Sequence, residues 1–207
     1  MTTVKVEEIK ETDNTGTQKE TTKKTRTKKT TQTKKEVKSK STINKELRAN
    51  AKDIDVEVQS LVKGEVFYCS RKTGEILELS EIGDREIISL DLLMDISKRC
   101  KKLLSNLVIS ISDIYSEDYK LEDIIEFFGL KDLYSFKEMT LEEIDDFILN
   151  TDLTEFEKEF TNIQNENLKF RLIERSVGLV KEGLLDSTAK MKLFEVAYGT
   201  EYLYKNI

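Results

Sequence analysis

The chain has 207 residues, of which 38% are hydrophobic and 36% charged, and its formal net charge is −6. It contains no histidine, which excludes the usual forms of Ser-His-Asp hydrolases, zinc deaminases and HExxH proteases, because each needs an imidazole. No apolar run approaches the roughly 20 residues that span a bilayer, and residues 1–10 lack the apolar centre of a secretory signal. We therefore expect synthesis in the cytoplasm and no membrane partner.

Charge divides the chain into two parts of opposite sign. Residues 1–50 hold 14 Lys and Arg against 7 Asp and Glu, a net of +7, whereas residues 51–207 hold 20 against 33, a net of −13. From Thr21 to Lys35 there are seven Thr, seven Lys or Arg, one Gln and no apolar side chain. Such a segment cannot bury enough surface to offset its conformational entropy. We predict a disordered basic arm over residues 1–52 and a folded domain over residues 53–207.

The arm supplies the candidate contact residues. Its cations can neutralise phosphates and release bound counterions, and such binding is indifferent to base sequence. The candidate contacts with DNA or another anion are Lys23, Lys24, Arg26, Lys28, Lys29, Lys34 and Lys35. Two other uses stay open, because segments of this composition also serve as solvated linkers or as tails that fold when they dock on a protein.

Alternation of apolar and polar residues opens the folded part and predicts strands. Ile54, Val56 and Val58 fall on one side of the first strand. Further strands are predicted at residues 66–70, 75–79, 87–88 and 107–112. A four-residue loop at residues 71–74 joins the second strand to the third. These segments predict a small antiparallel β-meander.

From Ser89 onward the apolar residues recur with three- and four-residue spacing, which predicts one helix of about four turns with Ser89 as its N-cap. Its basic end, Lys98 to Lys102, complements the helix dipole and is a second possible anion contact. The hairpin sequence Ser70 to Gly74 is a third. For both segments we favour the structural use, as a helix end and as a turn.

Beyond Ser116 the pattern is helical almost throughout. Helices are expected near residues 121–128, 140–148, 154–160, 165–182 and 187–198, with N-caps at Thr140, Thr154 and Ser187 and glycine ends at Gly129, Gly183 and Gly199. The aromatic residues of this region are spaced as core residues. The prediction is one mainly helical α+β domain, with a β-meander and helix over residues 53–115 and a bundle-like helical part over residues 116–207. A split into two domains near Ser116 is the alternative.

Neither the cysteines nor the carboxylate clusters predict a chemical site. Cys69 and Cys100 have apolar neighbours and are expected to be buried, unbridged thiols. The acidic clusters at residues 142–146 and 155–159 lack the pattern of a calcium loop, and no Gly-rich phosphate loop occurs. We expect these clusters on the wet faces of helices. The sequence predicts no enzymatic activity, cofactor, metal or catalytic residue.

Several segments of the folded part together resemble a known class of protein. They are Val66 to Glu75, Gly83-Asp84, the Leu-rich helix with its basic end, Ile173 to Arg175, Lys181 to Ser187 and Phe194-Glu195. In this order they resemble small virion-associated proteins of tailed bacteriophages that infect low-GC Gram-positive bacteria, over most of residues 54–200. The resemblance implies a structural or assembly role in a phage particle, without enzymatic activity, and a location first in the host cytoplasm and then in the virion.

The sequence therefore favours a non-enzymatic phage structural or assembly protein. Its folded part would bind other virion subunits, its arm would contact DNA or an acidic protein surface, and the chain would form a homo-oligomer in the particle. The alternative is a non-specific nucleic-acid-binding accessory protein that acts in the cytoplasm, in which the arm provides the affinity.

Overall fold

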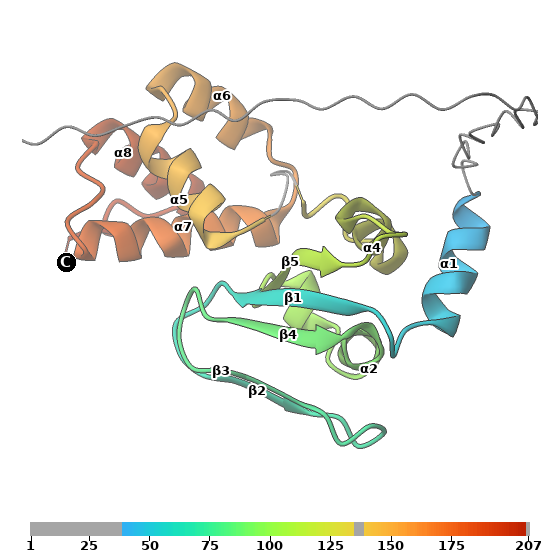
Figure 1. Ribbon diagram of the computed structural model, residues 1–207. Coiled ribbons are helices and arrows are strands. Elements are labelled where there is room, and N and C mark those ends of the chain that lie inside the picture. Colours follow the sequence, from blue (N-terminus) through green and yellow to red (C-terminus); the bar gives the residue numbers. More distant parts are fainter. Residues whose placement is uncertain (1–38, 135–138, 206–207) are drawn as a thin grey trace, which may run out of the picture. The chain divides into compact units, whose positions relative to one another are not determined.

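The computed structural model describes residues 39–134 and 139–205. The chain divides into two units, Met1–Val37 and Lys38–Ile207, and the first lies outside the described residues together with its predicted disorder. The described part of the second unit is a mainly helical α+β fold with small antiparallel sheets, as predicted (Figure 1). No helix within the described ranges is long and apolar enough to cross a bilayer.

Helices and strands follow one another in this unit as the periodicity of the sequence indicates. In chain order they are α1 (Lys40–Ala49), β1 (Asp55–Ser60), β2 (Val66–Cys69), β3 (Ile76–Leu79), β4 (Arg85–Ser89), α2 (Leu90–Arg99), α3 (Lys102–Ser105), β5 (Ile109–Tyr115), α4 (Leu121–Phe128), α5 (Leu141–Asn150), α6 (Leu153–Asn162), α7 (Glu166–Lys181) and α8 (Thr188–Tyr198).

Helix α1 shows that the predicted end of the arm at residue 52 is wrong. The helix begins at Lys40, and the Ser39 hydroxyl caps its N-terminus. Leu47 and Ala51, four residues apart, are buried, and Ile43 packs partly against the same core. This stripe of apolar residues, which the Lys/Thr-rich segment lacks, gives the helix a face to bury.

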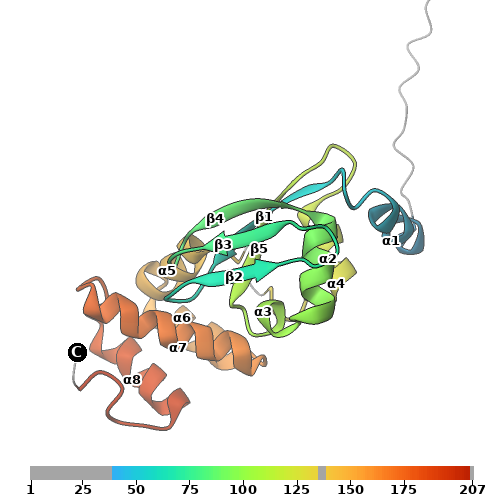
Figure 2. The same ribbon diagram turned by 90° about the horizontal axis from the view of Figure 1, so that it is seen from below.

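The strands form two sheets, and their order differs from the predicted meander. A three-stranded sheet has the order β4-β1-β5, while β2 and β3 form a separate hairpin (Figure 2). All pairs are antiparallel. In a meander β1 would pair with β2, but its neighbours are β4 and β5, and Val58, Gln59 and Ser60 are buried in this central strand. The apolar alternation therefore located the strands correctly and left their partners undetermined.

The long helix predicted after residue 89 is interrupted. Ser89 caps α2 as predicted, since its hydroxyl accepts a hydrogen bond of 3.1 Å from the Leu92 amide. Cys100 then leaves helical geometry at φ −126° and ψ 47°, and the short helix α3 follows. Leu104 and Leu107 are buried after this break, where the chain turns into β5.

The expectation that both cysteines are buried is wrong for Cys69 and only partly met by Cys100. Cys69 is exposed on the outer side of the β2-β3 hairpin, whereas Cys100 is half-buried at the end of α2. Both are free thiols. Strand alternation explains the difference, because Tyr68 occupies the inner side of β2 and Cys69 therefore points outward.

Most helix ends after residue 116 match the prediction. Thr140 and Ser187 cap α5 and α8, and Gly129 and Gly199 end α4 and α8 in left-handed geometry. The predicted cap at Thr154 is wrong, because α6 begins at Leu153 and the Asp152 carboxylate accepts from the Thr154 amide at 3.0 Å.

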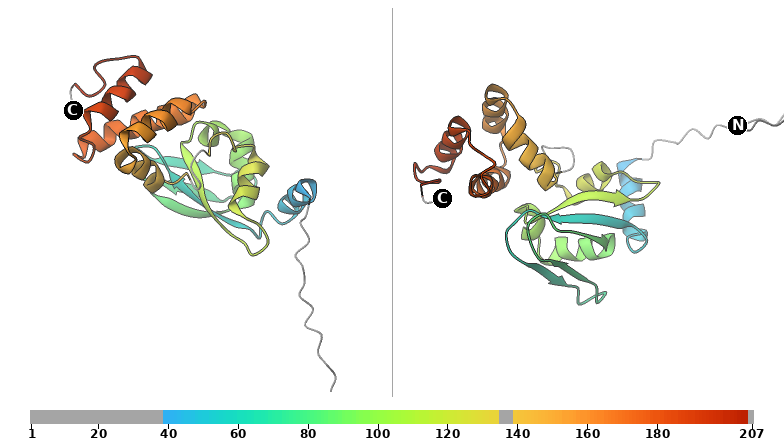
Figure 3. Two further views of the ribbon diagram at one scale, coloured as in Figure 1. Left: turned by 90° about the horizontal axis from the view of Figure 1, so that it is seen from above. Right: turned by 60° about the vertical axis from the view of Figure 1, so that its left-hand side comes forward.

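Helices α5 to α8 gather into a bundle-like group with an aromatic centre (Figure 3). Phe156 stacks on Phe160 at a ring separation of 5.5 Å, and Phe194 meets both rings edge-on. Beside them the buried Lys190 donates hydrogen bonds of 2.8 and 3.2 Å to carbonyl groups of Ile148 and Leu149 near the end of α5. Of the aromatic residues predicted in the core, Phe147 and Phe156 are buried, and Phe136 lies outside the described residues. The others are half-buried and pack against the core: Phe127, Phe128 and Tyr134.

Candidate functional site

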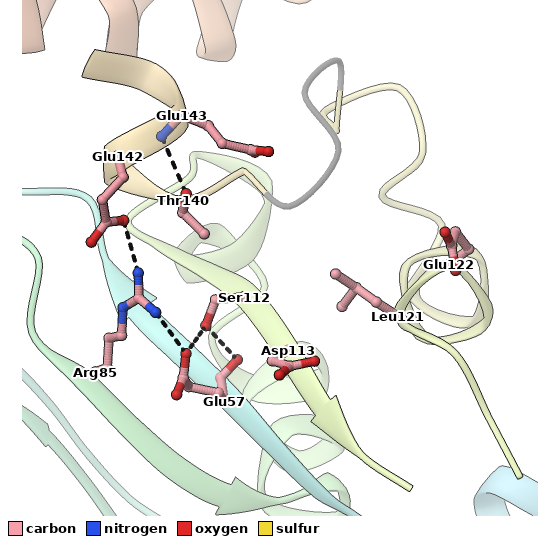
Figure 4. A pocket seen from close by; sticks show the side chains of 9 residues that line it. All are labelled: Glu57, Arg85, Ser112, Asp113, Leu121, Glu122, Thr140, Glu142 and Glu143. Atoms are coloured by element: carbon pink, nitrogen blue, oxygen red, sulfur yellow. Dashed lines mark hydrogen bonds and ion pairs between the residues drawn. The ribbon is translucent and has the colours of Figure 1, made fainter. Parts of the chain in front are cut away.

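The candidate site is a cleft of about 480 Å³ between α4, α5 and the outward face of the β4-β1-β5 sheet (Figure 4). It is lined by Glu57, Arg85, Ser112, Asp113, Leu121, Glu122, Thr140, Glu142 and Glu143. Five of these nine residues are carboxylates and one is an arginine, so the formal charge of the lining is −4. We call this feature the acidic cleft.

The strand register determines which side chains lie next to one another on the sheet face below the acidic cleft. Ile87 on β4 pairs with Glu57 on β1, and Glu57 pairs with Asp113 on β5. Residues that are directly opposite in antiparallel strands share a face, so these three side chains form a row across the sheet. The register shifts beyond Glu57, and the extra residue on β5 is Ser112, which brings its hydroxyl to Glu57.

Arg85 lies between two carboxylates of the acidic cleft. Its Nη1 donates to Glu57 Oε1 at 3.2 Å, and its Nη2 donates to Glu142 Oε2 at 2.8 Å. Glu57 also accepts from the Ser112 hydroxyl at 2.7 Å and from the Tyr115 hydroxyl at 3.2 Å. The negative charge of Glu57, together with burial, raises the pKa of Tyr115. Hydrogen bonds thus hold the Glu57 and Glu142 side chains in place.

Gln59 on β1 connects the sheet to α5 through hydrogen bonds at one end of the acidic cleft. It is fully buried, and its Oε1 accepts from the Leu141 amide at 2.8 Å. Its Nε2 donates to the Gly83 carbonyl at 3.1 Å and to Glu142 at 3.3 Å. Burial alone would raise the pKa of Glu142, but a backbone hydrogen bond, Gln59 and the charge of Arg85 outweigh burial, and the pKa is lowered.

Helix starts explain part of the negative charge. Glu122 lies in the first turn of α4, and Glu142 and Glu143 lie in the first turn of α5. Carboxylates are favoured there by the partial positive charge of a helix N-terminus. Glu57 and Asp113 have no such helix, because they are on strands. The fold therefore brings two strand carboxylates to the same place as two acidic helix starts.

Asp113 and Glu122 are the members of the lining best placed to attract an external cation. Both are exposed, and among the described residues neither has an ion-pair partner. Asp113 accepts a hydrogen bond only locally, from the Ile114 amide at 2.7 Å. A guanidinium or ammonium group that enters the acidic cleft can pair with either side chain.

The three anion contacts predicted from the sequence do not form this site. The seven cations of the arm, Lys23 to Lys35, lie outside the described residues. In the hairpin, the Lys72 ammonium binds Asp91 at 2.7 Å and the Ser70 hydroxyl donates to Asp95 at 2.8 Å. At the end of α2, Arg99 Nε donates to Asp95 at 2.9 Å. The hairpin thus contacts acidic side chains of α2 through Lys72 and Ser70, whereas Arg99 pairs with Asp95 inside α2 itself.

Asp95 is the centre of that second polar cluster. Hydrogen bonds from Ser70 first, then from Tyr68 and Arg99, lower the pKa of the Asp95 carboxyl to about 2. Burial first, then the hydrogen bond to Asp95, raises the pKa of Tyr68 to about 12. This arrangement stabilises the contact between the β2-β3 hairpin and α2 and leaves Asp95 little capacity to bind a ligand.

Within residues 39–134 and 139–205 no group of three or more Cys, Asp and Glu side chains is placed to hold a metal ion. The lining offers charge and hydrogen-bond acceptors over an open area. Such a surface suits an extended cationic ligand.

Sequence patterns alone do not reveal the acidic cleft. Glu57, Arg85 and Asp113 come from three strands and read as the ordinary polar side of each one. Glu142 and Glu143 were expected on a wet helix face, and the fold places them at the rim of the acidic cleft. No local signal could have joined these segments, because their neighbourhood depends on the strand order β4-β1-β5.

No protein-family model, no curated protein and no solved structure matches the chain.

Proposed function

We propose that this chain is a non-enzymatic assembly protein of a phage particle, whose folded part binds basic surfaces of other virion subunits while its arm contacts DNA. The observation that carries the proposal is the acidic cleft, with five carboxylates against one guanidinium, in a chain whose residues 1–50 carry +7. The basic arm attracts an acidic partner, and the acidic cleft attracts a basic one. The chain would act as an adaptor between an acidic polymer and a basic protein surface.

A binding role fits the chemistry of the acidic cleft better than a catalytic one. Glu57 is fixed by Arg85, Ser112 and Tyr115, and Glu142 has a lowered pKa. A general acid would need a carboxyl whose pKa is raised toward neutrality. The Glu142 carboxylate, whose pKa is lowered, instead provides a steady attraction for cations.

The phage assignment rests on the resemblance of segments such as residues 66–75 and 181–187 to small virion-associated proteins. It implies a location in the host cytoplasm at synthesis and in the virion afterwards. Mass spectrometry of purified particles tests it. We expect peptides of residues 39–205 at a fixed number of copies per particle, and a complete absence from particles would contradict the proposal.

A matched pair of variants tests the role of the acidic cleft in the same experiment. D113N/E122Q removes two charges from the cleft, whereas E157Q/E159Q removes two exposed charges from α6. We expect the first variant to enter particles at a reduced copy number and the second to match the wild type. Equal incorporation of both variants would show that the acidic cleft has no part in assembly.

The second candidate function is a non-specific nucleic-acid-binding accessory protein in the cytoplasm. The observation that favours it is the run of seven cations from Lys23 to Lys35 without an acidic residue. This candidate predicts that the chain co-purifies with nucleic acid in cell extracts and is missing from particles. The particle analysis therefore separates the two.

A further inference from the structure

We infer that the acidic cleft binds the basic arm of a second copy of this chain, so that copies associate through exchanged arms. This inference rests on the proposed function and names the partner of the same site. Its occupant is the segment from Thr21 to Lys35 of the neighbouring copy. Charge complementarity supports the choice, since that segment has seven cations and no acidic residue, and the cleft lining has a formal charge of −4.

The composition of this segment suits an open cleft on a sheet face. It alternates threonine with basic residues and has no Gly or Pro. Threonine favours extended backbone, and an extended segment of this length spans about 50 Å. That length lets a few consecutive residues lie across the acidic cleft while the remainder reaches back to the neighbouring copy. A compact ligand would contact fewer of the carboxylates that line the cleft.

Individual groups of the acidic cleft match this occupant. Asp113 on β5 and Glu122 on α4 face the space from two sides (Figure 4). Arg26 can bind a carboxylate through two parallel hydrogen bonds, and the lysines can supply point charges along the row. Arg85 is already engaged by Glu57 and Glu142, so it repels the incoming cations less than a free guanidinium would.

The geometry of such an exchange has a consequence for assembly. The arm of one copy and the cleft of another are different surfaces, so the contact is heterologous and can continue from copy to copy. DNA binds the same cations of the arm and therefore competes with the cleft. A single arm therefore binds either DNA or a neighbouring cleft, whereas the free arm at the end of an assembly can still contact DNA.

Complementation between two full-length variants tests the inference. K28Q/K29Q/K34Q/K35Q weakens the arm and keeps the cleft, whereas D113N/E122Q weakens the cleft and keeps the arm. We expect wild-type chain to associate with rising concentration at low ionic strength in analytical ultracentrifugation. Each variant alone should associate about tenfold more weakly, as expected for a few partly exposed ion pairs, and a 1:1 mixture should form a heterodimer close to wild-type affinity.

Two controls accompany this experiment. E157Q/E159Q should associate as wild type does, and added duplex DNA should dissociate the wild-type assembly. If D113N/E122Q fails to fold, the single variant Glu122→Gln replaces it. Wild-type chain that stays monomeric at all concentrations, or a mixture that associates no better than its components, overturns the inference. A monomeric chain that is nevertheless present in particles leaves the proposed function standing and removes only the exchanged arm.

Discussion

Among single residues, Arg85 makes the central ion pairs of the acidic cleft. It neutralises Glu57 and Glu142, which come from a strand and a helix that are 85 residues apart in the sequence. The substitution Arg85→Gln leaves two neighbouring carboxylates without their cation. Because the Arg85 side chain is 39% exposed, water screens the loss, and we expect a destabilisation of about 1 kcal/mol. Denaturant unfolding measures it.

A control shows whether this loss belongs to the site. Arg71 is an exposed arginine in the β2-β3 hairpin loop, away from the acidic cleft. Arg71→Gln changes the net charge by the same amount and should alter the free energy of unfolding by less than about 0.5 kcal/mol. Equal destabilisation by both substitutions would mean that net charge, and no local pairing, produces the effect.

Asp95 gives a pH dependence whose sign follows from its hydrogen bonds. Its pKa is lowered to about 2 in the folded chain, below the ordinary value near 4. The folded state therefore gains stability from this group above about pH 4 and loses it as the pH falls toward 2. We expect the difference in Tm between wild type and Asp95→Asn to shrink over this range. A difference that stays constant from pH 5 to pH 2 would contradict the assigned role.

At the scale of elements, Arg175 joins α5 to α7. Its Nε and Nη2 donate to the two carboxylate oxygens of Asp145 at 2.6 and 2.7 Å, and its Nη1 donates to Glu182 at 3.0 Å. These partners, Asp145 first, raise the pKa of the Arg175 guanidinium, so the group stays charged. One member of the acidic cluster at residues 142–146 thus has a structural partner.

Removing that cation should cost more than removing Arg85. The Arg175 side chain is 9% exposed, and Arg175→Met leaves the Asp145 carboxylate in a half-buried position without its partner. We expect a destabilisation of about 3 kcal/mol. The matched control is Lys181→Met, an exposed cation near the end of the same helix, for which a small change is expected. Similar unfolding free energies for the two variants would contradict the bidentate pairing.

Local sequence rules predicted many elements because they act over a few residues. Ser89, Thr140 and Ser187 mark true helix starts, and alternation from Ile54 to Val58 marks a true strand. The same rules could not select the partners of β1, since pairing is made by backbone hydrogen bonds with strands that are distant in the sequence. For that reason the β-strand order was wrong and the acidic cleft, which depends on it, was missed.

Two other differences have physical causes of the same kind. The helix after Ser89 breaks at Cys100 although the apolar spacing continues, because the chain buries Leu104 and Leu107 before it enters β5. Helix α1 forms inside the region assigned to the arm, because Leu47 and Ala51 find a core to pack against. Both outcomes depend on tertiary packing, which outweighs composition and periodicity over short segments.

At the scale of the whole molecule, α1 moves the expected protease boundary. Limited proteolysis of the free chain should cut within the Lys-rich segment and leave a fragment that starts close to Ser39, because α1 buries Leu47. An arm that extends over residues 1–52 would instead give a fragment that starts near Asp53. N-terminal sequencing of the stable fragment decides between them, and resistance of residues 19–35 would contradict a disordered arm.

We claim that the basic arm, and not the acidic folded part, provides the affinity for DNA. Binding measured as a function of salt concentration tests this. Full-length chain should bind duplex DNA without sequence preference, with a log–log salt slope of about −3 to −6 if some or all of the seven cations reach phosphate. A full-length variant with Lys23, Lys24, Arg26, Lys28, Lys29, Lys34 and Lys35 changed to Gln should not bind, since the net charge of residues 51–207 is −13. Undiminished binding by that variant would contradict the claim, and so would a wild-type chain that ignores DNA at low salt.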